Sequence, residues 1–259
     1  MTARPLVLLA FVFALAPGPG STADAPPVAR PGKDFLSPEL RRLQDDDMRN
    51  PGTLWVELGA ERWAEAPPSG GKSCRDCHGD AATSMQGVAA RYPAFDKNEG
   101  RLLNLELRIE QCRTRRQGAA KFGYESESLL ALTAYVAGQS RGLPMNVAVD
   151  GPAKPYFDAG RAFHERRQGQ LNLACAQCHV GLVGKRLRGD TISSGVGTGF
   201  PAYRMEWNGL GSLHRRFRAC SFAVRAALHD LGSPEYLGLE LYLAWRARGL
   251  QIETPAVRP

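Results

Sequence analysis

Apolar residues recur at the helical spacing i, i+3, i+7 in two segments, Leu129, Leu132 and Val136, and Tyr236, Leu239 and Leu243. Ser233-Pro234-Glu235 before the second segment combines a capping residue, a first-turn proline and an acid. Gly142 and Gly249, each preceded by an arginine, predict where the two helices end. Two further helices are predicted over 54–64 and 156–167, and strand-like alternation is scarce. The pattern therefore predicts an all-α fold.

The two halves of the chain repeat the same landmarks in the same order. Gly59 precedes Cys74 by 15 residues, as Gly160 precedes Cys175. Further matches are Cys74-Arg75-Asp76-Cys77-His78 with Cys175-Ala176-Gln177-Cys178-His179, Tyr92-Pro93-Ala94-Phe95 with Phe200-Pro201-Ala202-Tyr203, and Arg108 and Cys112 with Arg216 and Cys220. Such order indicates an internal duplication with a domain-sized period. We expect an extended leader over 26–52 and tandem domains over 53–147 and 148–259, divided where prolines and glycines cluster between 144 and 155.

The N-terminus has the pattern of an export signal. Arg4 precedes an apolar run from Leu6 to Ala16, and Ala23-Asp24-Ala25 offers a small-residue cleavage site. The run is too short to span a bilayer, which takes about 20 residues. We expect a signal peptide over 1–25, a periplasmic mature chain without a membrane span, and an oxidising compartment.

Composition narrows the class of protein only slightly. Hydrophobic residues make up 43% and charged residues 23%, which excludes wholesale disorder, collagen and coiled coil. The formal charge of +7 is modest. It favours an anionic partner and gives no good reason to expect nucleic acid.

The two CxxCH motifs carry most of the chemical information. Cys74 and Cys77, and likewise Cys175 and Cys178, can bond covalently to the two vinyl groups of a haem. His78 and His179 then lie where a ring nitrogen can bind the iron. A CxxC redox pair and half a zinc site are the rival interpretations. Two copies in an exported, duplicated chain favour two covalently bound c-type haems in class I cytochrome c-like domains.

The residue type that recurs in both halves and can supply a sixth iron ligand is cysteine. Cys112 and Cys220 stand at matched positions, whereas no methionine of the expected mature chain does. An axial thiolate on each iron is the simplest interpretation, and it would lower the reduction potential. A Cys112–Cys220 disulfide and free thiols remain open at this point.

The segment before Cys220 is strongly basic. Arg215, Arg216 and Arg218 lie within the five residues that precede it, and on a helix Arg216 would share a face with Cys220 one turn away. Arginine can bind a small sulfur oxyanion through two parallel hydrogen bonds. The alternative is that these arginines pair with haem propionates or carboxylates. For Arg108, together with Arg113, Arg115 and Arg116, we expect pairing with haem propionates.

With these motifs the sequence resembles the SoxA family, the dihaem subunits of SoxAX cytochrome complexes of periplasmic sulfur oxidation. The most specific stretches are Tyr124-Glu125-Ser126-Glu127 leading to Gln139-Ser140-Arg141-Gly142, the run Gly211-Ser212-Leu213-His214-Arg215-Arg216-Phe217-Arg218-Ala219-Cys220, and the tail Ile252-Glu253-Thr254-Pro255-Ala256-Val257-Arg258. The resemblance covers nearly all of the expected mature chain.

The resemblance implies an L-cysteine S-thiosulfotransferase. Such an enzyme joins thiosulfate oxidatively to a cysteine of the carrier protein SoxYZ, and electrons leave through the monohaem partner SoxX. Carried onto this chain, Cys220 is the catalytic cysteine, found in the family as a persulfide, and Arg216 binds the anion. His179 and Cys220 would ligate the second iron, and His78 and Cys112 the first. A dihaem electron carrier without bond-forming activity and a thiol oxidoreductase of another substrate are the alternatives.

Overall fold

Residues 28–259 are described by the computed structural model, and the expected signal peptide lies outside them. The helices are α1 (Pro38–Asp45), α2 (Gly52–Ala64), α3 (Cys74–His78), α4 (Ala81–Ser84), α5 (Leu105–Arg115), α6 (Glu127–Gly138), α7 (Lys154–Glu165), α8 (Cys175–His179), α9 (Leu213–Ala223) and α10 (Pro234–Arg246). The four helices predicted from the sequence are confirmed as α2, α6, α7 and α10.

Short strands supplement the helices. β1 (Ala94–Asp96) pairs antiparallel with β2 (Arg101–Leu103), and β3 (Arg186–Leu187) with β4 (Asp190–Thr191). A three-stranded sheet has the order β6-β5-β7, formed by β6 (Gly209–Gly211), β5 (Ala202–Arg204) and β7 (Ala256–Arg258). The all-α expectation thus describes the helical framework, to which these strands are added.

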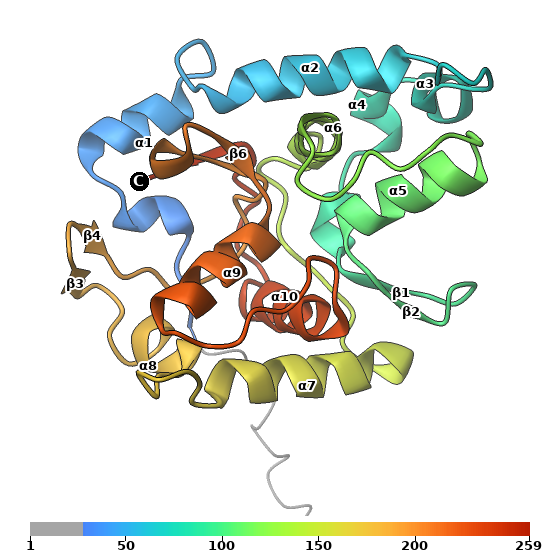
Figure 1. Ribbon diagram of the computed structural model, residues 1–259. Helices are drawn as coiled ribbons and strands as arrows, with labels where there is room; N and C mark the ends of the chain where they lie inside the picture. Colours follow the sequence, from blue (N-terminus) through green and yellow to red (C-terminus); the bar gives the residue numbers. More distant parts are fainter. Residues whose placement is uncertain (1–27) are drawn as a thin grey trace, which may run out of the picture.

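Two helix pairs form the framework (Figure 1). α2 crosses α6 and α7 crosses α10 at a steep angle, with α2 and α7 on opposite sides of the molecule. Each crossing is close because glycine stands where the helices meet: a Cβ on Gly59 would lie 2.2 Å from the Ala131 carbonyl oxygen. Buried residues of both halves, from Trp63 to Ile252, form one continuous hydrophobic core.

The predicted helix boundaries hold at the start of α10 and fail at the two C-terminal ends. The Ser233 hydroxyl accepts a hydrogen bond from the Tyr236 amide, and Pro234 is the first helical residue. However, α6 ends at Gly138 and α10 at Arg246, before the glycines that were expected to stop them. Gly142 and Gly249 instead adopt φ values of 80° and 82° in the turns that follow. These turns pair with each other through backbone bonds between Met145 and the segment at 249–250, a long-range contact that local patterns do not reveal.

The expectation of an extended leader over 26–52 is wrong. This segment contains α1, whose N-cap is Ser37 followed by Pro38. The buried Asn50 amide donates to the carbonyl oxygens of Gln44 and Pro255, and the Gln44 side chain accepts from the Val257 amide. The segment therefore folds against the C-terminal strand β7. Ser37-Pro38-Glu39 repeats the capping signal at Ser233 and would have revealed the helix from the sequence.

Among residues 28–259, no helix combines the length and the apolar character needed to cross a lipid bilayer.

Candidate functional site

Each CxxCH motif forms a short helix that follows a helix of the framework. α3 begins with a capping box, in which the Ser73 hydroxyl accepts from the Asp76 amide and the Asp76 carboxylate accepts from the Ser73 amide. At α8 the Gln177 side chain accepts from the Ala174 amide in the same way. The helical turn places both cysteines and the following histidine of each motif close together, which is the arrangement that covalent haem attachment requires.

The geometry around His179 prepares one ring nitrogen for a metal. His179 Nδ1 lies 2.9 Å from the Ser193 carbonyl oxygen. A carbonyl only accepts, so Nδ1 carries the proton and Nε2 keeps its lone pair. Burial lowers the pKa of His179, and the nearby Arg216 and Arg246 lower it further. A neutral, oriented imidazole of this kind is the form that binds iron.

His78 in the first half is held by a different contact. Its ring lies 5.8 Å from the Trp63 ring, centroid to centroid, and the Trp63 indole donates to the Gly79 carbonyl oxygen. Trp63 belongs to α2, so the framework helix fixes the segment that bears the histidine.

Cys112 and Cys220 each lie near the CxxCH motif of their own half. Burial raises the pKa of the Cys112 thiol, and nearby Cys77 adds to the rise. Likewise, burial raises the pKa of the Cys175 thiol to about 11, with neighbouring Cys220 as a further cause. All six cysteines of the sequence lie within the described residues, and none forms a disulfide. The structure thus does not pair Cys112 with Cys220.

The arginines around these cysteines have different environments. Arg216 and Cys220 both lie on α9, one turn apart, as expected. Arg108 lies on α5 and pairs with Asp96 at 2.6 Å. Arg115 also pairs with a carboxylate, that of Glu99 at 2.5 Å. The structure thus pairs Arg108 and Arg115 with protein carboxylates, whereas the sequence led us to expect haem propionates as their partners.

Sequence reasoning missed two buried arginines near the second motif. Arg246 donates to the His179 carbonyl oxygen at 3.2 Å and contacts His164 Nε2 at 3.1 Å. Arg204, at the end of β5, has a pKa lowered by burial and by the neighbouring Arg216, while the nearby Cys220 opposes this change. A signal for Arg204 existed in the repeat, because the matched residue of the first half is an acid, Asp96.

The residues present fit a c-type haem. Each half brings together two thiols on one helical turn, an adjoining histidine and a third thiol from a later helix. In the second half the buried Nε atoms of Arg204 and Arg246 have no hydrogen-bond partner among the described residues. A buried N–H group without an acceptor is costly, and an anionic group such as a haem propionate or an oxyanion would supply the missing acceptor for these Nε atoms.

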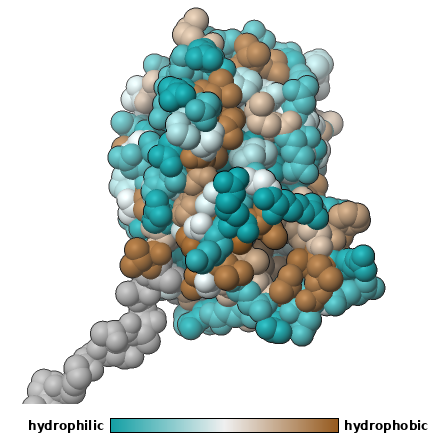
Figure 2. All heavy atoms as spheres, turned by 90° about the vertical axis from the view of Figure 1, so that its left-hand side faces the viewer, coloured by the Kyte–Doolittle hydropathy of each residue, from teal (hydrophilic) through white to brown (hydrophobic). Residues whose placement is uncertain are grey.

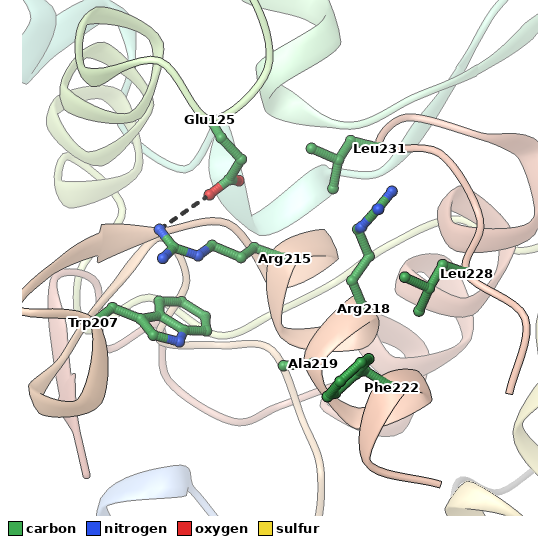
Figure 3. A pocket seen from close by; sticks show the side chains of 8 residues that line it. All are labelled: Glu125, Trp207, Arg215, Arg218, Ala219, Phe222, Leu228 and Leu231. Carbon is green, nitrogen blue, oxygen red and sulfur yellow. Dashed lines mark ion pairs between the residues drawn. The ribbon is translucent and has the colours of Figure 1, made fainter. Parts of the chain in front are cut away.

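A pocket of about 410 Å³ opens on another part of α9 (Figure 3). It is lined by Glu125, Trp207, Arg215, Arg218, Ala219, Phe222, Leu228 and Leu231. The Arg215 guanidinium lies 4.2 Å from the centre of the Trp207 ring and 3.9 Å from the Glu125 carboxylate. The pocket therefore adjoins the helix that carries Cys220 and has a mainly apolar wall with arginines at its edge.

Comparison with known proteins connects this arrangement to one family. The family profile described as "SoxA/TsdA, cytochrome c domain" matches residues 58–145. The L-cysteine S-thiosulfotransferase subunit SoxA of Pseudaminobacter salicylatoxidans is 44% identical over 225 residues, which cover 86% of this chain and 79% of that protein. The subunit of the same name from Paracoccus pantotrophus is 36% identical over 240 residues, 93% of this chain and 82% of that protein.

A solved structure agrees with the sequence relatives. The crystal structure of SoxXA from P. pantotrophus contains a chain that matches with a TM-score of 0.85 and 36% identity, over 89% of this chain and 87% of that one. The cytochrome c domain accounts for the covalent haem expected from the CxxCH motif. The chain belongs to the SoxA family of L-cysteine S-thiosulfotransferase subunits.

Proposed function

We propose that Cys220 is the catalytic cysteine of this thiosulfotransferase and that Arg216 binds its anionic substrate. The observation that carries the proposal is the position of both residues one turn apart on α9, beside the second CxxCH motif. Arg216 supplies a fork of donors for a sulfonate group. Cys220, a persulfide in the form that the family resemblance implies, is the reactive sulfur beside which the terminal sulfur of thiosulfate is held.

The overall reaction is an oxidative coupling of two sulfurs. A carrier thiol and thiosulfate lose two electrons and one proton as a sulfur–sulfur bond forms, giving a cysteine S-thiosulfonate on SoxYZ. When bound, haem supplies the electron acceptor of this step. The protein's part is to hold the anion next to Cys220 through Arg216 and to keep His179 neutral and oriented through the Ser193 carbonyl oxygen.

We further propose two covalently bound haems in tandem cytochrome c domains over 53–147 and 148–259. Cys74 and Cys77 attach the first haem, and Cys175 and Cys178 the second. His78 and Cys112 are the proposed ligands of the first iron. His179 and Cys220 are those of the second. The recurrence of the same order of elements, α2-α3-β1-α5-α6 and α7-α8-β5-α9-α10, supports both haems and the duplication. Intact mass of the mature protein tests the haem count and reveals any extra sulfur on a cysteine.

The expected partners are SoxX, SoxYZ and thiosulfate, and the expected location is the periplasm. The relative of known structure is described as SoxXA, a complex. Apolar side chains are exposed just after the second CxxCH motif, at Val180, Leu182 and Leu187. On the face that carries α1 and the β3–β4 hairpin, hydrophobic residues lie in separate groups among hydrophilic ones (Figure 2). Such a mixed surface suits an interface between subunits.

The test compares Cys220→Ala with Cys112→Ala in the complex with SoxX. We expect Cys220→Ala to abolish thiosulfate-dependent mass gain of the carrier while both haems stay attached, because attachment uses other cysteines. Cys112→Ala is the matched control and should retain most activity, since it alters only the first site. Full activity of Cys220→Ala would contradict the proposal and favour a plain electron carrier.

A further inference from the structure

The two candidate sites share one framework and differ by a reversal of charge at one position. β1 ends at Asp96 and β5 ends at Arg204, the third residue of each strand. In both halves an arginine follows 12 residues later, Arg108 on α5 and Arg216 on α9. Cys112 and Cys220 then follow four residues after that arginine. The two halves thus match in these spacings, but the side chain at the end of the strand is negative in one half and positive in the other.

In the first half Asp96 forms an ion pair with Arg108. Asp96 Oδ2 lies 2.6 Å from Arg108 Nη2, and the Asp96 side chain is only 4% exposed. The amides of Glu99 and Asn98, together with Arg108, hold the pKa of Asp96 below its usual range. Arg108 Nε donates in addition to the Tyr92 hydroxyl. An anion that approached Arg108 would meet a carboxylate already bound to it, so this site is closed to anions.

In the second half the same position adds a positive charge. Arg204 is 7% exposed, and its pKa is lowered by burial and by Arg216, which are the marks of two guanidinium groups held near each other. The ion-pair partner of Arg204 is Glu206, whose side chain is 64% exposed and so well screened by water. Arg204 Nε is buried and has no hydrogen-bond partner among the described residues.

Arg204 is buried and Arg216 is half-buried, so their like charges repel each other through a poorly solvated region, and a bound anion relieves that repulsion. Arg204 cannot move away easily, because its strand is hydrogen-bonded on both sides by β6 and β7 and its guanidinium lies 5.0 Å from the Trp207 ring centre. Cys220 lies near Arg204, since it opposes the lowering of the Arg204 pKa, and it stands one turn from Arg216 on α9.

We propose that Arg204 and Arg216 together form the binding site for a small doubly charged oxyanion of the thiosulfate and sulfate class, and that Asp96 is what closes the matched site of the first half. This inference rests on the proposed function of Cys220 and adds a second, specificity-determining arginine to it. Two guanidinium groups match the charge of the dianion and can share its oxygens.

The experiment uses the assembled complex with haems bound and compares Arg204→Gln with Asp96→Asn. We expect Arg204→Gln to raise the KM for thiosulfate at least tenfold with a smaller change in kcat, and to weaken inhibition by sulfate by a similar factor. Arg204→Lys keeps the charge without the fork and should fall in between. Asp96→Asn, the control at the matched position, should leave both constants unchanged.

A turnover-independent measurement separates this inference from the proposed function. Sulfate binding to the resting complex is followed by calorimetry, so a loss of binding in Arg204→Gln supports the inference even if no carrier conjugation is found. Unchanged sulfate affinity and KM, with a shifted haem potential, would overturn it and make Arg204 a propionate partner. If Arg204→Gln does not fold, Glu206→Gln provides the test: it frees Arg204 and should lower the KM, and an unchanged or higher KM counts against the site.

Discussion

Gly160 on α7 lies directly against the backbone of Gly238 on α10, since a Cβ at Gly160 would come within 1.9 Å of the Gly238 carbonyl oxygen. Gly59 has the same relationship to Ala131 on α6. These contacts explain why a glycine stands 15 residues before each CxxCH motif. They set how closely the framework helices cross.

Gly160→Ala should therefore destabilise the protein severely. The added methyl group meets backbone atoms that cannot rotate away, so the two helices must separate, and we expect a loss of about 3 kcal/mol or more in the free energy of unfolding. Gly138→Ala is the control, because it is also helical and its Cβ would meet nothing within 4 Å. Denaturant unfolding should show Gly138→Ala to be neutral or stabilising by up to about 1 kcal/mol. Equal midpoints for the two variants would refute the close crossing.

The environment of His164 leads us to expect that the free energy of unfolding falls at acidic pH. Burial and nearby Arg246 lower its pKa to about 3. Because the pKa in the folded state is below that of the unfolded chain, the associated stability is present above about pH 6.5 and is lost as the pH falls towards 3. At pH 4.5 the loss from this group amounts to about 2–3 kcal/mol at most.

His164→Gln should remove that part of the acid sensitivity, since glutamine can accept the hydrogen bond from Arg246 without titrating. The measurement is the free energy of unfolding at pH 7 and pH 4.5, with His229→Gln as the control on a more exposed histidine. A pH dependence that is identical in wild type and His164→Gln would show that His164 is not held neutral by the fold.

Asn50 ties the N-terminal segment to the C-terminal tail. Its amide donates to the Pro255 carbonyl oxygen at 2.9 Å, and its side-chain oxygen accepts from the Gly52 amide at 2.8 Å. Asn50→Ala leaves these buried groups unpaired, so we expect a cost of about 1–3 kcal/mol and faster proteolysis of the tail. Met48→Ala, at a residue that is 95% exposed, is the control. Unaltered proteolysis in Asn50→Ala would mean that the tail is held elsewhere.

The proposed axial ligation of iron by cysteine can be tested by electron paramagnetic resonance of the ferric protein. We expect low-spin signals of thiolate type, of which Cys112→Ser removes one component and Cys220→Ser the other. Each loss should be confined to its own half, because each of these cysteines lies by its own CxxCH motif. Signals typical of His/Met or His/His ligation in the wild type would contradict this assignment.

The sequence by itself determined the four long helices and the motif chemistry, because both depend on residues that are neighbours along the chain. The apolar spacing of α6 and α10 and the cap at Ser233 act within a few turns, and each CxxCH motif works on a single turn. The position of Arg216 one turn before Cys220 was also predictable, since a separation of four residues on one helix fixes it.

Only the tertiary structure decided which segments that are distant in the sequence come into contact. Three such contacts join a strand or a loop to a helix. They are the ion pair between Asp96 and Arg108, the nearness of Arg204 to Arg216, and the contact of the Ser193 carbonyl oxygen with His179. The docking of the leader on β7 joins the two ends of the described chain. Such contacts depend on how the helix pairs pack, and local propensity carries no information about them.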